Sequence, residues 1–169
     1  MKYIETSIPD VWVLEPRVFE DARGYFMETW REEDFNQHIG RKVHFVQDNQ
    51  SLSSRGVLRG LHYQKGELSQ AKLVRVLQGV VVDVIVELSE DNKRQLFIPR
   101  GFAHGFQVLS PKAVFTYKVD NRYAPEAECS IRFDDPSIGI EWPINDPSEV
   151  LLSEKDLAHA VSFEAAEKF

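Results

Sequence analysis

The sequence predicts an all-β fold, a sandwich or barrel of short strands, in a single domain that spans residues 1–169. Two observations predict it. Short runs rich in Val, Ile and Phe alternate with turn residues along most of the chain. Two of these apolar runs, Val57–Tyr63 and Ile98–Phe106, each contain a histidine. A polar group among inward-facing apolar side chains needs a partner or a function, so these runs also indicate a site inside the barrel.

Composition and turn residues define the elements in order. The expected strands are Val11–Phe19, Tyr25–Trp30, His44–Ser51, Val57–Tyr63, Ala71–Leu77, Val80–Leu88, Gln95–Ile98, Ala103–Leu109, Ala113–Val119 and Ser130–Phe133. A helix is expected over Arg31–Ile39, where Phe35 and Ile39 are four residues apart and Gly40 follows as a stop. A second short helix is expected to start at Ser153, because Ser-Glu-Lys-Asp resembles a capping box.

Charge and cysteine content exclude several classes of function. The formal net charge of −7 argues against nucleic acid as a partner, because phosphate binding needs a basic face. The single cysteine, Cys129, excludes an internal disulfide and fits a reducing compartment. We see no export signal and no apolar run long enough to span a bilayer, so a cytoplasmic location without membrane contact is expected. A small anionic ligand remains possible where a few Arg and Lys converge.

Arg59 and His62 are the first candidates for a site. On a regular strand His62 shares a face with Leu58 and Gly60, whereas Arg59 points the other way. Both border one cavity only if the strand bulges, and Gly60 is where a bulge costs least. A lone histidine is more often a core residue bonded to backbone. Arg59 and His62 therefore predict a site only if the strand bulges at Gly60.

Lys72 and Tyr117 are further candidates, each with a simpler structural explanation. Lys72 and Arg75 lie on opposite faces of their strand, and either could face solvent or point into the barrel. An inward ammonium would stabilise a developing oxyanion. Tyr117 shares a face with Phe115, which fits simple packing, but a phenol aimed into a polar cavity is also a suitable proton donor.

Metal chemistry is the less favoured alternative. Zinc and iron sites in small barrels use several His and carboxylate ligands, commonly with His-x-His or His/Glu spacing. Here His62 and His104 each supply one ligand, and no third ligand lies at a suitable spacing. We therefore expect no metal.

Several motifs together resemble one known family. They are Asp21–Glu28, Gln47–Ser51, Gly56–His62, Gln70–Val74, Ile98–Phe106, Tyr117-Lys118, Tyr123–Glu128, Asp134–Pro136, Trp142-Pro143 and Leu152–Asp156. On these residues nearly the whole chain resembles the dTDP-4-dehydrorhamnose 3,5-epimerases of the cupin superfamily. Pro99-x-Gly101-x-x-His104 matches the second cupin motif, whereas the first motif, with its paired metal histidines, is absent, as in this metal-free branch.

The resemblance implies a cupin jelly-roll β-barrel with a few short helices, and a homodimer in which N-terminal strands cross to the partner. It implies an isomerase of dTDP-rhamnose biosynthesis. The reaction would invert C3 and C5 of dTDP-4-dehydro-6-deoxy-D-glucose to give dTDP-4-dehydro-L-rhamnose. No cofactor is implied, because the ketone of this dTDP-linked 4-keto-6-deoxysugar provides the electron sink.

The family's roles then fall on individual positions. By this resemblance His62 is the general base, oriented by Asp156, and Tyr117 is the general acid on the opposite ring face. Lys72 stabilises the C4 enolate. Contacts to the nucleotide, the diphosphate and the rest of the pocket fall on Arg23, Phe26, Glu28, Gln47, Asn49, Arg59, His104, Tyr123 and Glu128.

One segment departs from the family pattern. After Val80–Val86, family members usually run through an additional hairpin with a Ser-Pro turn, and here Glu87-Leu88-Ser89 follows at once. None of the carried-over catalytic residues falls in this gap. Cys129-Ser130 also replaces the more usual Arg-Gly.

Two alternatives remain. A sister epimerase that inverts only C3 or only C5 shares these motifs, because the outcome depends on how the ring sits between His62 and Tyr117. A non-catalytic sugar-nucleotide-binding cupin is disfavoured, since binding alone would not need a His–Asp pair, a lysine and an opposing acid together.

Overall fold

Two antiparallel β-sheets form the body of the protein in the computed structural model, which describes residues 1–167. The first sheet contains β1 (Lys2–Glu5), β2 (Trp12–Glu15), β5 (Gln47–Ser54), β7 (Lys72–Gln78), β10 (Gln95–Ile98) and β12 (Lys112–Val119). The second contains β6 (Leu58–Gln64), β8 (Val80–Asp83), β9 (Val86–Ser89), β11 (His104–Val108) and β13 (Glu128–Ser130). Outside them lie β3 (Val18–Asp21), β4 (Gly24–Met27), α1 (Glu32–Ile39), α2 (Glu154–His159) and two short 3₁₀ turns, Gly66–Leu68 and Pro125–Ala127.

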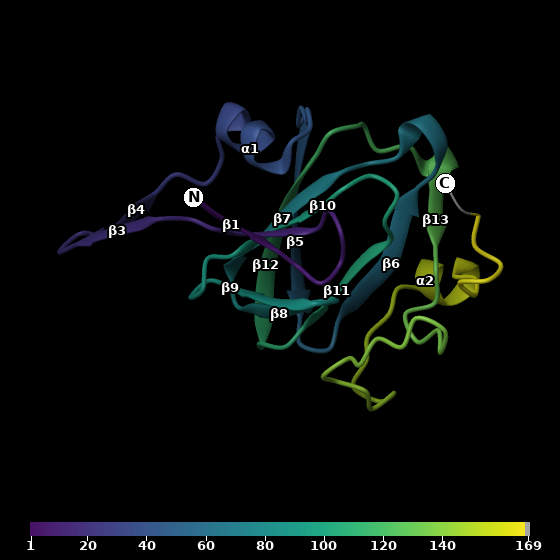
Figure 1. The fold of residues 1–169 in the computed structure, drawn as a ribbon. Helices are drawn as coiled ribbons and strands as arrows, with labels where there is room; N and C mark the ends of the chain where they lie inside the picture. Colours follow the sequence, from purple (N-terminus) through teal and green to yellow (C-terminus); the bar gives the residue numbers. More distant parts are fainter. Residues whose placement is uncertain (168–169) are drawn as a thin grey trace.

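The arrangement is the predicted jelly roll, with two facing sheets that stay separate in the described chain rather than closing into one barrel. The strand orders are β1-β2-β10-β7-β12-β5 and β13-β6-β11-β8-β9. The hairpin β3–β4 projects from the body, and α2 lies beside β6 and β13 at the opposite end (Figure 1). No helix among residues 1–167 is both long enough and apolar enough to cross a membrane.

Apolar side chains pack in three layers. The space between the sheets is filled by one cluster, which includes Val74, Val76, Val81, Phe106 and Phe115. A second cluster packs α1 on the outer face of the first sheet and includes Phe35, Ile39, Leu14, Leu73 and Phe97. A third covers the outer face of the second sheet with the C-terminal segment and includes Leu58, Leu61, Tyr63, Ile131 and Trp142. These layers fix which face of each strand points inward.

The N-terminal strands differ from the sequence prediction. The expected strand Val11–Phe19 is divided into β2 and β3 by Pro16 and Arg17, because Pro16 has no N–H to donate to a ladder. The sequence analysis also missed β1, a short strand that pairs with β2 along its full length. The expected strand His44–Ser51 starts later, as β5, and extends to Ser54.

The expected strand Val80–Leu88 is in fact a tight hairpin. β8 and β9 pair from Val80↔Ser89 to Asp83↔Val86, and only two residues form the turn between them. Val84 adopts a φ of 22°, which is unfavourable for a β-branched residue. The last expected strand, Ser130–Phe133, lies earlier, as β13. Both helices form as expected, and the Ser153 hydroxyl accepts a hydrogen bond from the Asp156 N–H at the start of α2.

A bulge interrupts the pairing of β6 with β11. His62 pairs with His104 and Arg59 pairs with Phe106, so two residues of β6 face the single Gly105 of β11. Gly60 has a φ of +146°, and a Cβ there would lie 2.5 Å from the Cα of Gly105. The backbones therefore approach more closely than any residue with a side chain allows.

We expect Gly60→Ala to lower the free energy of unfolding by about 1–3 kcal/mol through overpacking, in addition to the strain of its φ. Gly24→Ala is the matched control, because Gly24 has a φ of +124° but no atom of a non-adjacent residue within 4 Å of the place that an added methyl group would occupy. Chemical denaturation of both variants measures the difference. Equal losses in the two variants would show that strain alone, and not the close approach, makes Gly60 necessary.

Candidate active site

A polar cavity of about 260 Å³ lies between the two sheets. Both sheets contribute, with His62 and Arg59 from β6, Lys72 from β7 and Tyr117 from β12. The full lining is Asn49, Gln50, Ser51, Arg59, His62, Lys72, His104, Phe106, Phe115, Tyr117 and Glu128. A base, a cation and a phenol thus face one small space.

The bulge of β6 brings Arg59 and His62 to this cavity despite their opposite strand parity. This is the condition that the sequence analysis set for a site. Arg59 Nε donates to Ser53 Oγ at 3.2 Å, and the residue as a whole remains exposed. Its guanidinium therefore lies at the mouth of the cavity, where it is accessible to an anion.

His62 and Asp156 are in contact although they are far apart in sequence. His62 Nε2 is hydrogen-bonded to Asp156 Oδ1, and Asp156 is buried. The other carboxylate oxygen, Asp156 Oδ2, accepts a bond of 2.8 Å from the Ser153 hydroxyl. The N-terminal turn of α2 therefore fixes the carboxylate, which in turn fixes the imidazole and leaves Nδ1 as its second ring nitrogen.

Lys72 points inward with Val74 and Val76, and Arg75 faces outward, which resolves the two possibilities left by the sequence. Burial lowers the pKa of Lys72 to about 8, against the opposing effect of the negative charges of Asp83 and Glu128. No hydrogen-bonding partner of the ammonium is found within residues 1–167. It is available to a ligand in the cavity.

Tyr117 lies across the cavity and packs against the core, with its ring 6.1 Å from that of Phe115. Burial raises the pKa of its phenol, the Arg59 guanidinium opposes this effect, and Glu128 adds to it. The phenol therefore keeps its proton at neutral pH. Tyr117 therefore packs against the core and also lines the polar cavity.

Asp83 was not singled out by the sequence analysis, which took Val80–Leu88 as one strand. It is almost fully buried, and its Oδ2 lies 2.7 Å from His104 Nε2. His104 in turn stacks on Phe115. The only sequence signal was a charged residue in an apolar run, the same signal that identified His62.

Glu128 is held at the cavity by two partners. The Tyr123 hydroxyl donates to Glu128 Oε2 at 2.5 Å, and Lys155 Nζ forms an ion pair with the same oxygen. Burial acts to raise the pKa of Glu128, but these two contacts outweigh it and the pKa is lowered. Lys155, which the sequence analysis did not single out, precedes Asp156 on α2, so this helix reaches the cavity twice.

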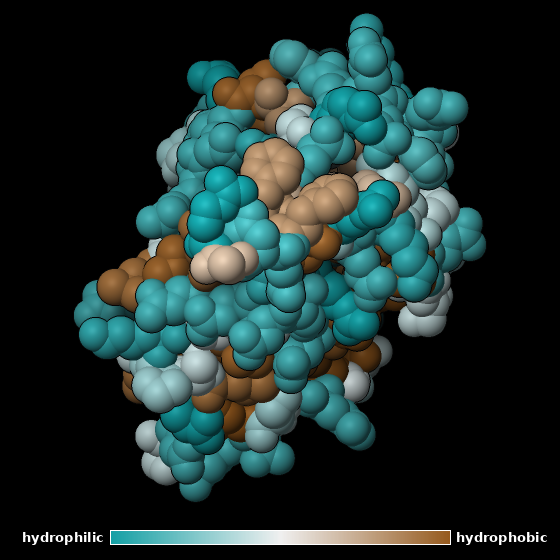
Figure 2. Space-filling model, turned by 90° about the vertical axis from the view of Figure 1, so that its left-hand side faces the viewer, coloured by the Kyte–Doolittle hydropathy of each residue, from teal (hydrophilic) through white to brown (hydrophobic). Residues whose placement is uncertain are grey.

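The remaining predicted binding residues lie elsewhere in the chain. Arg23 and Phe26 are in the projecting hairpin, where Phe26 is 72% exposed and Arg23 bonds only to Asp21 among the contacts described. Glu28 follows the hairpin and lies 3.6 Å from Arg31. Gln47 donates to Asn49, which lines the cavity. Figure 2, which looks onto the hairpin end, shows apolar side chains gathered on a mostly hydrophilic face.

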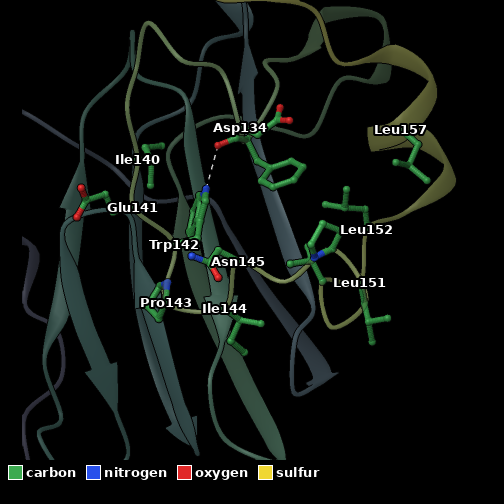
Figure 3. Close-up of a pocket in the computed structure, with 13 residues that line it drawn as sticks. Asp134, Ile140, Glu141, Trp142, Pro143, Ile144, Asn145, Leu151, Leu152 and Leu157 are labelled. Atoms are coloured by element: carbon green, nitrogen blue, oxygen red, sulfur yellow. Dashed lines mark hydrogen bonds between the residues drawn. The ribbon is translucent and has the colours of Figure 1, made fainter.

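A larger hollow of about 1180 Å³ lies at the C-terminal segment, around Trp142 and Leu152 (Figure 3). Its lining is mostly apolar, and its charged residues are the carboxylates Asp134 and Glu141. It holds no base, phenol and cation together, so we assign the chemistry to the smaller cavity. Within the described part of the chain, no three His, Cys, Asp or Glu side chains are grouped so as to hold a metal ion.

Comparison with known proteins gives one family. The family model described as dTDP-4-dehydrorhamnose 3,5-epimerase matches residues 5–89 and 85–164. The dTDP-4-dehydrorhamnose 3,5-epimerase of Shigella flexneri is 51% identical over 172 aligned positions, covering 93% of each chain.

Solved structures agree. The dTDP-4-dehydrorhamnose 3,5-epimerase of Elizabethkingia anophelis superposes with a TM-score of 0.92 at 48% identity, covering 97% of each chain. A 3,5-epimerase of Legionella pneumophila, solved in complex with dTDP-4-keto-L-rhamnose, gives a TM-score of 0.89 at 43% identity and covers 95% of this chain and 92% of that one.

Proposed function

The chain belongs to the dTDP-4-dehydrorhamnose 3,5-epimerase family, and from this premise we propose how its cavity carries out the reaction. The enzyme is an isomerase that inverts C3 and C5 of dTDP-4-dehydro-6-deoxy-D-glucose to give dTDP-4-dehydro-L-rhamnose. Both carbons are α to the C4 ketone, so each inversion is removal of a proton to form an enolate followed by return of a proton to the opposite face. The observation that carries the proposal is one cavity that holds His62, Lys72 and Tyr117.

His62 is the base in this proposal. Its contact with Asp156 orients the ring and stabilises the imidazolium that forms when the proton is taken. The acceptor nitrogen is Nδ1, because Nε2 is engaged by the carboxylate. The Ser153 hydroxyl donates to the other oxygen of Asp156 and so holds this carboxylate in place.

Lys72 and Tyr117 complete the proton transfers. The Lys72 ammonium stabilises the charge that develops on the C4 oxygen, and it acts strongly because it is buried. Tyr117 returns the proton from the other side of the ring, and its raised pKa keeps the phenol protonated until then. The ketone accepts the electrons at each step, so the proposal needs no cofactor.

The substrate's dTDP group is proposed to lie at the cavity mouth. The Arg59 guanidinium there suits a diphosphate, which it can bind with forked hydrogen bonds. Asn49, His104 and Glu128 line the cavity beside it, and Tyr123 reaches it through its bond to Glu128. These contacts allow an acidic protein to hold an anionic sugar nucleotide.

We further propose a homodimer in which the β3–β4 hairpin of one protomer completes the cavity of the other. The hairpin projects away from its own body, and its Phe19, Tyr25 and Phe26 side chains are at least half exposed. Arg23 at its tip is 90% exposed. Exposed aromatic rings on a projecting ribbon suit a partner surface, and a second copy would bring Arg23, Phe26 and Glu28 to the nucleotide. We also propose a cytoplasmic location.

Incubation with dTDP-4-keto-6-deoxyglucose in heavy water, followed by proton NMR, tests the activity. We expect loss of the proton signal at both C3 and C5, because both positions pass through an enolate. Exchange at one carbon only would favour the single-site epimerase. Exchange at neither carbon would leave a binding protein.

Tyr117→Phe separates the two halves of the reaction. Epimerised product should fall on the order of 10²–10⁴-fold, the usual contribution of a positioned acid. Solvent deuterium should still enter, since His62 can return it to the original face. Full product formation would move the acid role elsewhere, and the matched variant Tyr123→Phe tests the next phenol.

Subunit mixing tests the shared site. His62→Ala and Arg23→Ala homodimers are each expected to be inactive or weak. A heterodimer of the two contains one cavity with native His62 and a native hairpin, so random exchange should restore about a quarter of the native sites. No gain in activity after verified exchange would show that hairpin and cavity act within one chain.

A further inference from the structure

Asp83 is a buried carboxylate for which the proposed proton transfers have no role. It is 1% exposed and ends β8 on the inward face, two residues after Val81 of the central core. Its Oδ2 bonds to His104 Nε2 at 2.7 Å. Its Oδ1 is buried and has no hydrogen-bond partner among the described residues. Buried acceptors are rarely left in this state, so Oδ1 requires an electrostatic explanation.

Lys72 is the corresponding unmatched cation. Its ammonium borders the cavity, and within residues 1–167 it forms no ion pair within 4 Å. Two negative charges act to raise the pKa of Lys72, and Asp83 has a larger effect than Glu128. The titratable and charged groups that face Lys72 are Asp83 from β8, Glu128 from β13, Arg59 and His62 from β6, His104 from β11 and Tyr117 from β12.

We infer that Asp83 is a positioning residue with two functions, in which Oδ2 fixes the His104 imidazole and Oδ1 provides the fixed negative charge that keeps buried Lys72 an ammonium. This inference rests on the proposed function. Glu128 contributes less to that charge, because Lys155 is paired with its carboxylate. Among the residues described, Asp83 has no lysine or arginine within 4 Å, and its one contact of that length is with the His104 imidazole.

The consequence concerns the range of pH over which the enzyme works. Only the ammonium form of Lys72 stabilises an enolate, so turnover must fall as the pH rises through the Lys72 pKa of about 8. A negative charge nearby favours the ammonium and raises that pKa; its removal lowers it. Without Asp83 the loss of activity should therefore begin at a lower pH, and turnover near pH 8 should suffer most.

The test is Asp83→Asn, which keeps the shape and an oxygen for His104 but removes the charge. The Lys72 pKa is followed by NMR of ¹³C-labelled lysine, assigned with Lys72→Met. We expect it to fall below about 8, with a several-fold loss of kcat at pH 8, little change in KM and partial recovery of kcat at lower pH. Asp135→Asn is the matched control, because Asp135 is also buried but lies outside the cavity. Its carboxylate accepts hydrogen bonds from the Ser137 and Phe163 N–H groups, and the substitution removes one of these two acceptor oxygens.

The inference would be overturned if Asp83→Asn left the Lys72 pKa unchanged and also left unchanged the pH at which kcat falls on the alkaline side. This holds whatever the thermal stability of the variant. If wild-type protein shows no epimerisation, the proposed function fails, while the lysine titration still decides the role of Asp83. Should Asp83→Asn not fold, Asp83→Asn/Lys72→Met removes both charges together. Recovery of folding in that double variant supports the inference, since neither charge is then left unbalanced, and continued failure counts against it.

Discussion

The close approach of Gly60 to Gly105 is the constraint on which the candidate site depends. It lets β6 carry one more residue than β11 between their paired positions, so Arg59 and His62 turn to the same side. The same pairing sets His104 directly opposite His62. This backbone contact therefore sets where the β6 and β11 side chains enter the cavity, and side-chain contacts to Asp156 and Asp83 then hold the two imidazoles. A methyl group at Gly60 would press on the backbone of Gly105, not on a side chain that could move aside.

The charges of the cavity follow from this frame. Each titratable group that faces it is held by a partner outside the reacting space. Asp156 engages His62 from α2, Lys155 and Tyr123 engage Glu128, and Asp83 engages His104 from β8. Lys72 and Tyr117 are the exceptions, and they are also the groups whose pKa values burial shifts in opposite directions. Within the described residues, the groups without partners are the two to which the proposed mechanism assigns direct contact with the substrate.

Sequence reasoning predicted the fold class and the approximate positions of the central strands, because strand periodicity and turn residues are local signals. It left open which face of Ala71–Leu77 points inward, because periodicity alone does not say which side of a strand is buried. The location of His62, Lys72 and Tyr117 in one cavity, and the contact of His62 with Asp156, came from a resemblance, since no local signal joins β6 to α2. The bulge was expected at Gly60 on physical grounds. Asp83 and Lys155 were missed because their importance depends on partners from other strands and helices. Breaks at Pro16 and at the β8–β9 turn were missed because apolar composition continued across them.

The short β8–β9 hairpin lies next to the buried carboxylate Asp83, which is held by β11 and not by the turn itself. The family match divides into two segments that overlap at residues 85–89, where the sequence analysis expected a departure from the family pattern. In this structure a two-residue turn joins β8 to β9 there, with Val84 at an unfavourable φ. Asp83 precedes that turn directly, yet its position does not depend on it, because Asp83 also pairs with Phe106 of β11 and bonds to His104. The register of Asp83 with β11 and its bond to His104 therefore hold this carboxylate in place independently of the β8–β9 turn.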